Sequence, residues 1–169
     1  QFISELSKLD WIDCYTDLDY KANMIYAALH YGGESGVEVA SRCADQLMAK
    51  QEFNACYMAA SYYYLPMGEL EGYFSALQTG LRQERANSKA WNNVLTLCAQ
   101  SLYQLPASQM DVYMDGIASI QEQMEQANEA MLVDIALEPY NQALLEAVNT
   151  ARAQGLEGQE AYNHLVIAM

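Results

Sequence analysis

The amino-acid sequence predicts an all-α fold of about seven or eight helices, and three of its features lead to this prediction. Gly and Pro residues divide the chain into segments of helical length, with clear breaks at Gly32-Gly33, Pro66-Met67-Gly68, Pro106 and Gly155. No segment alternates between apolar and polar residues for long enough to indicate a strand. Aromatic and small residues also recur at a spacing of about 34 residues, which is typical of repeated helical hairpins.

The expected helices follow from these breaks in order. Gly32-Gly33 separates helices expected near 10–30 and 35–50, and a third helix near 53–65 ends at Pro66. Ser108 followed by Asp111 approximates a capping box, and Pro139 suits the first position of a helix because that position needs no amide donor. The remaining helices are therefore expected near 69–84, 88–105, 108–131, 139–154 and 158–168.

The segment from Asn54 to Asn87 has the strongest repeat signal. Tyr57 lies early in its first helix and is matched by Trp91 one repeat later. Small residues let adjacent helices approach closely, and large residues fill the gaps between them. The pattern resembles the tetratricopeptide (TPR) repeat at most of its marker positions, which are here Tyr57, Ala60, Tyr64, Gly68, Leu77, Gly80 and Leu81.

This resemblance implies a right-handed superhelix of antiparallel helix hairpins. A looser unit precedes the best one, at about 20–53, and half a unit follows it, so the repeat-like part covers 19–105. We expect 106–169 to form divergent or capping helices within the same single domain, 1–169. Gly72 and Tyr73 depart from the family pattern, and Pro is missing at the end of each unit, so the fold is described as TPR-like.

Two further blocks, at 53–72 and 134–146, resemble the helical-repeat tails that follow the membrane portion of bacterial O-antigen ligase or polymerase-like proteins, particularly in Firmicutes. The chain begins with Gln1 instead of Met, which we interpret as a sign that it is a fragment of a longer protein. The resemblance then implies a soluble accessory domain attached to a bacterial membrane protein, with the chemistry in the membrane portion. It leaves the membrane side and the localisation open.

Composition excludes some classes of partner. The formal net charge is −14, and no Lys or Arg occurs between Ala90 and Ala151, so nucleic acids and anionic lipids are not expected to bind. The most apolar stretch, Tyr57 to Met67, is too short to span a bilayer, which takes roughly 20 residues. The four cysteines are isolated in apolar helical stretches and are expected to be reduced core residues: Cys14, Cys43, Cys56 and Cys98.

Catalytic, metal and cofactor sites are not expected. His30 and His164 have no partner at metal-ligand spacing, and His30 is expected at a helix end. Glu122, Glu125 and Glu129 share one helix face that is also rich in Gln, as a solvated surface would be, and Glu69/Glu71 is a second acidic pair. A carboxylate hydrolase stays open as an alternative, because an enclosed pocket holding two of these acids would favour it.

The TPR resemblance implies a concave groove, lined by first-helix positions, that binds a protein or a peptide. Within the cluster Tyr62-Tyr63-Tyr64, Tyr64 fits a packing position and Tyr62 should face this groove, where exposed tyrosine suits peptides or glycans. The leading expectation is a protein-interaction or scaffolding module, and the alternative is an accessory domain of a cell-envelope polysaccharide enzyme. The matching groove positions are Lys21, Met24, Ala28, Ala55, Met58, Tyr62, Leu65, Lys89, Asn92 and Thr96.

Overall fold

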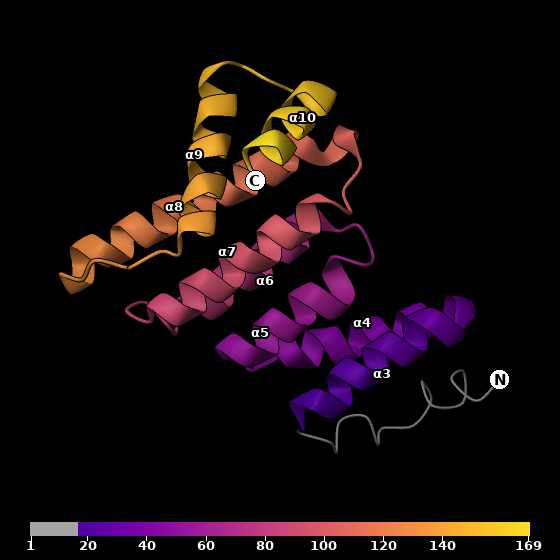
Figure 1. The fold of residues 1–169 in the computed structure, drawn as a ribbon. Coiled ribbons are helices and arrows are strands. Elements are labelled where there is room, and N and C mark those ends of the chain that lie inside the picture. The colour runs from indigo at the N-terminus through magenta and orange to yellow at the C-terminus, as the bar shows by residue number, and fades with distance from the viewer. Residues whose placement is uncertain (1–16) are drawn as a thin grey trace. The chain divides into compact units, whose positions relative to one another are not determined.

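The computed structural model describes residues 17–169, and all regular secondary structure in this range is helical. It contains eight α-helices, a π-helical turn and a 3-10 turn, so the all-α prediction is confirmed for the described residues (Figure 1). The chain divides into two compact units, with unit 1 ending at Gln83 and unit 2 beginning at Glu84. No described helix is long and apolar enough to cross a membrane.

Unit 1 consists of two successive helical hairpins. The first pairs α3 (Leu18–Tyr31) with α4 (Gly33–Ala49), and the second pairs α5 (Phe53–Ala59) and its continuation η1 (Ala60–Tyr64) with α6 (Leu70–Leu81). The Asp17 side chain caps α3 by accepting a hydrogen bond from the backbone amide of Tyr20 at 2.8 Å. Gly33 and Gly68 have positive φ angles of 56° and 71°, which explains the glycines at both hairpin turns.

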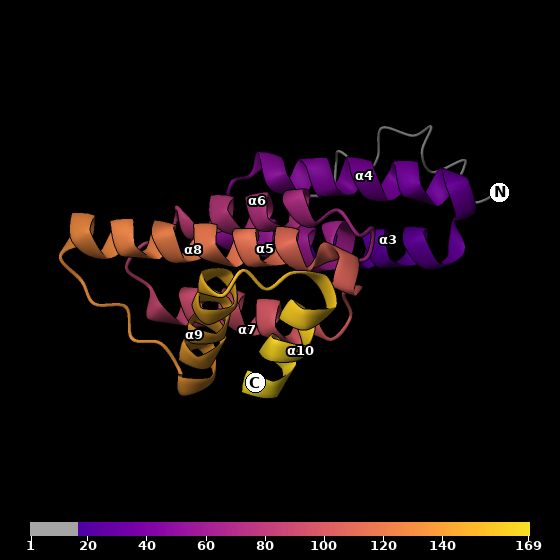
Figure 2. The same cartoon turned by 90° about the horizontal axis from the view of Figure 1, so that it is seen from above.

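The four helices of unit 1 form two layers. α3 lies beside α5 and η1, while α4 and α6 lie behind them (Figures 1 and 2). The buried core between α3, α4 and α5 includes Ile25, Val39, Leu47 and Ala59. α3 and α4 approach most closely at Gly36, where a Cβ atom would lie 2.0 Å from the carbonyl oxygen of Ala28. A larger residue at this position would therefore force the two backbones apart.

A π-helical turn interrupts the second hairpin at the tyrosine cluster. The amide of Leu65 donates to the carbonyl of Ala60 at 3.0 Å, five residues earlier, instead of the usual four. Tyr62 is exposed, Tyr63 is buried, and the Tyr64 ring lies over Gly72, where a Cβ would come within 2.5 Å of the ring. Gly72, which departs from the TPR pattern, is thus explained by the space that the Tyr64 ring needs.

Unit 2 contains α7 (Ser88–Leu102), η2 (Ala107–Gln109), α8 (Met110–Met131), α9 (Pro139–Ala153) and α10 (Gly158–Ala168). Within this unit α9 runs across α7 and α8 and also packs against α10 (Figures 1 and 2). The fully buried side chains of unit 2 include Trp91, Tyr113 and Ile117. Residues 133–138 form an extended connection between α8 and α9.

Most expected helix positions agree with the structure, and three details are wrong. A continuous helix over 10–30 is wrong because Asp17 has extended backbone angles; the part before it, with Cys14, lies outside the described residues. The helix expected at 53–65 contains the unforeseen π-helical turn. The capping box at Ser108 is absent, because Ser108 lies within η2 and α8 begins after Gln109 without a side-chain cap. Pro139 begins α9 as expected.

Candidate functional site

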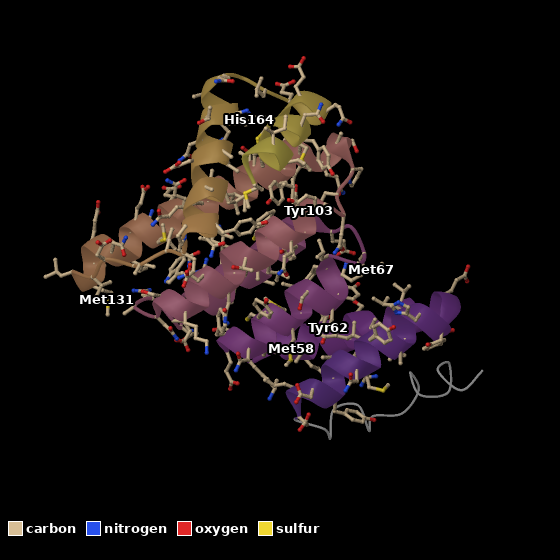
Figure 3. All side chains as sticks on the ribbon, in the orientation of Figure 1. Met58, Tyr62, Met67, Tyr103, Met131 and His164 are labelled. Atoms are coloured by element: carbon tan, nitrogen blue, oxygen red, sulfur yellow. The ribbon has the colours of Figure 1, made fainter. Side chains whose placement is uncertain are left out.

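Four of the expected groove residues are partly exposed on the first helices of unit 1, and we call them the first-helix face. Met24 comes from α3, Met58 from α5, Tyr62 from η1, and Leu65 directly follows η1. Met58 and Tyr62 lie on the same side of the second hairpin (Figure 3). Met24 and Met58 each pack one side against the core of unit 1, so the exposed parts of these side chains are held on a rigid base.

The other three expected groove residues of unit 1 are buried, so their assignment to an open groove is wrong. Ala28 and Ala55 are 1% and 0% exposed, because α3, α4 and α5 pack closely together. Lys21 is 4% exposed, and its Nζ donates a hydrogen bond to Oε1 of Gln46 on α4. Lys21 therefore joins α3 to α4 instead of lining an open groove.

His30 lies in the last turn of α3, as expected from the glycines that follow it. Its Nδ1 atom lies 2.9 Å from the carbonyl oxygen of Tyr26, and the Tyr26 and His30 rings stack at 4.0 Å. Tyr31, which ends the helix, is 79% exposed. This end of α3 thus presents two exposed tyrosine rings, Tyr26 and Tyr31, to solvent.

In unit 2, Asn92 holds the extended segment 133–138, which we call the strap, against α7. The Asn92 Nδ2 atom donates to the carbonyl of Ala136 at 2.8 Å, and Oδ1 accepts from the amide of Glu138 at 2.8 Å. The Ser88 hydroxyl accepts from the amide of Ala136 at 3.2 Å. Asn92 therefore binds backbone, as a peptide-binding residue would, but the peptide is part of the same chain.

Asn141 supports this arrangement from α9 and is fully buried. Its Nδ2 atom donates to the backbone oxygen of Asn92 at 3.2 Å and to the side-chain Oδ1 of Asn92 at 2.9 Å. The Thr96 hydroxyl donates to Oδ1 of Asn141 at 3.3 Å. The side chains of Asn92 and Thr96 are thus hydrogen-bonded within unit 2. Lys89, the third expected groove residue of α7, is exposed.

A solvent-open acidic groove of about 570 Å³ lies between α8 and α9. Asp115, Glu122 and Glu125 line it and are all exposed. Arg152 lies 3.4 Å from Asp115, with both side chains largely in solvent, where an ion pair contributes little. The groove holds two of the carboxylates considered in the sequence, Glu122 and Glu125, but it is not the enclosed pocket that acid–base catalysis requires.

Burial raises the pKa of one cysteine and one tyrosine in the core. Burial, and to a smaller extent the nearby Glu52 carboxylate, raises the pKa of the Cys56 thiol. Burial raises the pKa of Tyr113 well above its usual value, and its hydroxyl donates to the carbonyl of Cys98 at 2.9 Å. Cys43, Cys56 and Cys98 are buried and form no disulfide, as predicted for these three cysteines. All these groups act as packed core residues.

Sequence reasoning missed Ser88, which binds the strap, and Asn141, which reaches from α9 to the backbone oxygen of Asn92. Among residues 17–169, no group of three or more His, Cys, Asp or Glu side chains could hold a metal ion. Comparisons with protein-family models, curated proteins and solved structures found no match.

Proposed function

We propose that the protein is a helical interaction module, that unit 1 is TPR-like, and that its first-helix face binds a partner segment with apolar side chains. The observation that carries the proposal is the partial exposure of Met24, Met58, Tyr62 and Leu65 on or directly after the first helices of the two hairpins. A TPR-like arrangement is supported by the packing of α5 against both helices of the preceding hairpin.

The chemistry of this face suits a peptide. Methionine is flexible and polarisable, so Met24 and Met58 can adapt to different apolar side chains. The Tyr62 ring is 41% exposed and offers an apolar face with a polar hydroxyl. Tyr62 lies within the π-helical turn, a feature that often marks functional sites.

Acidic residues indicate which residues should flank the apolar part of the partner. Two short turns connect α3, α4 and α5, so α3 and α5 run in the same direction and begin at the same end of unit 1. Asp17 and Asp19 lie at the beginning of α3, and Glu52 precedes α5, all of them exposed. We therefore expect the bound segment to carry Lys or Arg beside its apolar residues, since opposite charges favour the encounter.

The test is a selection from a displayed peptide library against the immobilised chain, followed by titration calorimetry of a selected peptide. We expect Met58→Ser and Tyr62→Ser each to raise Kd at least tenfold, since aromatic anchors dominate such contacts. Tyr103→Ser, at a 53% exposed tyrosine of unit 2, should leave Kd unchanged. Unchanged affinity in both unit 1 variants, with helicity retained by circular dichroism, would reject the proposed face.

A glycan is the second candidate ligand, and the two exposed rings at the end of α3 favour it. A flat tyrosine ring can stack on the apolar face of a sugar, and glycan binding of this kind would suit an accessory domain of a polysaccharide enzyme. An oligosaccharide array should then show binding that Tyr31→Ala abolishes and Tyr62→Ala preserves. An array without signal at millimolar sugar would reject this candidate and leave the peptide proposal standing.

A further inference from the structure

The strap is bound to α7 in the manner of an extended peptide. Its side chains alternate: Val133, Ile135 and Leu137 are buried or half-buried, whereas the residues between them are exposed. Ser88 and Asn92, one helical turn apart, hold both the amide and the carbonyl of Ala136. Because these bonds go to backbone atoms, they hold an extended chain in place, and the alternating aliphatic side chains decide which sequence fits.

The Asn92 side chain is fully used in this arrangement. Its Nδ2 atom donates to Ser88 and Ala136, and its Oδ1 atom accepts from Glu138 and Asn141. We propose that this surface of α7, formed by Ser88 and Asn92, is a receptor for extended polypeptide. The strap occupies it in cis, and a segment of another protein with aliphatic side chains at alternate positions displaces the strap.

The strap has the features of a segment that opens locally. Ile135, at 6% exposure, is its one buried side chain, and the hydrogen bonds at Ala136 and Glu138 are exposed to solvent. Leu132, which connects α8 to the strap, has a positive φ of 52° and is 92% exposed, an unfavourable conformation for leucine. Few buried contacts and exposed backbone bonds are typical of regions that open before the whole fold does.

This site does not depend on the first-helix face of unit 1, so one experiment can separate the two. The probe is a fluorescein-labelled peptide with the sequence of residues 131–140, followed by fluorescence anisotropy on the whole chain. Ala136→Pro removes the amide that donates to Ser88 and loosens the strap while leaving α7 unchanged. We expect this variant to bind the peptide at least tenfold more tightly than the wild type, whose strap competes at high effective concentration.

Four controls define the site. Adding Asn92→Ala to Ala136→Pro should remove the gained binding, whereas adding Tyr62→Ala should preserve it. Asp134→Ala, at an exposed strap side chain, should bind as weakly as the wild type. A peptide with the residues equivalent to Ile135 and Ala136 exchanged should bind at least tenfold more weakly, because its aliphatic side chains are out of phase. No gain in Ala136→Pro, or a gain that survives Asn92→Ala, would overturn the proposal.

Hydrogen exchange on the wild type gives a second test that does not depend on a variant folding. The amides of Ala136 and Glu138 should exchange at least tenfold faster than those in the middle of α9, and saturating peptide should accelerate them further. The strap amides could instead exchange at the same rate as the α9 amides and show no effect of peptide. That result would contradict a displaceable strap.

Discussion

The close approach of α3 and α4 makes Gly36→Ala a sensitive test of the packing in unit 1. A Cβ at this position would lie 2.0 Å from the carbonyl oxygen of Ala28 and 2.9 Å from its carbonyl carbon. Both helices must then move apart by about 1 Å, and such overpacking costs about 3 kcal/mol, the upper end of its usual range. Replacing Gly by Ala in a helix returns about 1 kcal/mol. The net expectation is a loss of about 2 kcal/mol, or roughly a thirtyfold change in the folding equilibrium.

The assay is urea denaturation of the whole chain, followed by circular dichroism and by amide exchange at residues of α3 and α4. Glu38→Ala, an exposed position on the same helix, is the control and should change the free energy of unfolding by less than about 0.5 kcal/mol. The sign of the change decides the outcome. A Gly36→Ala protein that is as stable as the wild type, or about 1 kcal/mol more stable, would refute the close backbone packing.

Three further predictions concern buried polar and ionisable groups. Asn141→Ala should lower the free energy of unfolding by about 2 kcal/mol, because it removes a buried amide that bonds the half-buried Asn92 and Thr96. Asn149→Ala, at an exposed position, should change it little, and urea titration measures both. Because the pKa of Tyr113 is raised in the folded protein, its contribution to stability is complete below the unfolded tyrosine pKa of about 10 and is lost as pH rises above it. Tyr113→Phe should therefore weaken the fall of the unfolding free energy with pH in the alkaline range. Cys56 should react with a thiol reagent at pH 7.5 only as fast as unit 1 opens, and labelling within seconds, read by mass spectrometry, would contradict its burial and raised thiol pKa.

Local signals allowed the helices to be predicted, because glycine and proline act on the backbone within a few residues. Gly33, Gly68 and Gly155 have positive φ angles at breaks expected from the sequence, and Pro139 begins α9. The π-helical turn at Ala60 was not predictable, because no composition distinguishes one extra residue per turn from an ordinary helix.

The candidate site was predicted less well, because burial and occupancy depend on contacts between distant residues. Repeat positions assigned Met58 and Tyr62 to a groove, and both are partly exposed. The same positions assigned Ala28 to the groove, but the structure buries it between helices. Asn92 was expected to be available to a ligand. Its partners Ala136 and Glu138 lie 44 and 46 residues away in sequence, a separation across which periodicity gives no information.

Selective ¹³C labelling of the methionine methyl groups tests the proposed interaction face most directly. The nine methionines give separate NMR signals, and a peptide selected for binding would be titrated into the whole chain. We predict that the signals of Met24 and Met58 shift in proportion to binding, while those of Met110 and Met114, buried in unit 2, stay in place. Signals of Met24 and Met58 that stay fixed while the peptide binds would contradict the assignment of the partner to unit 1.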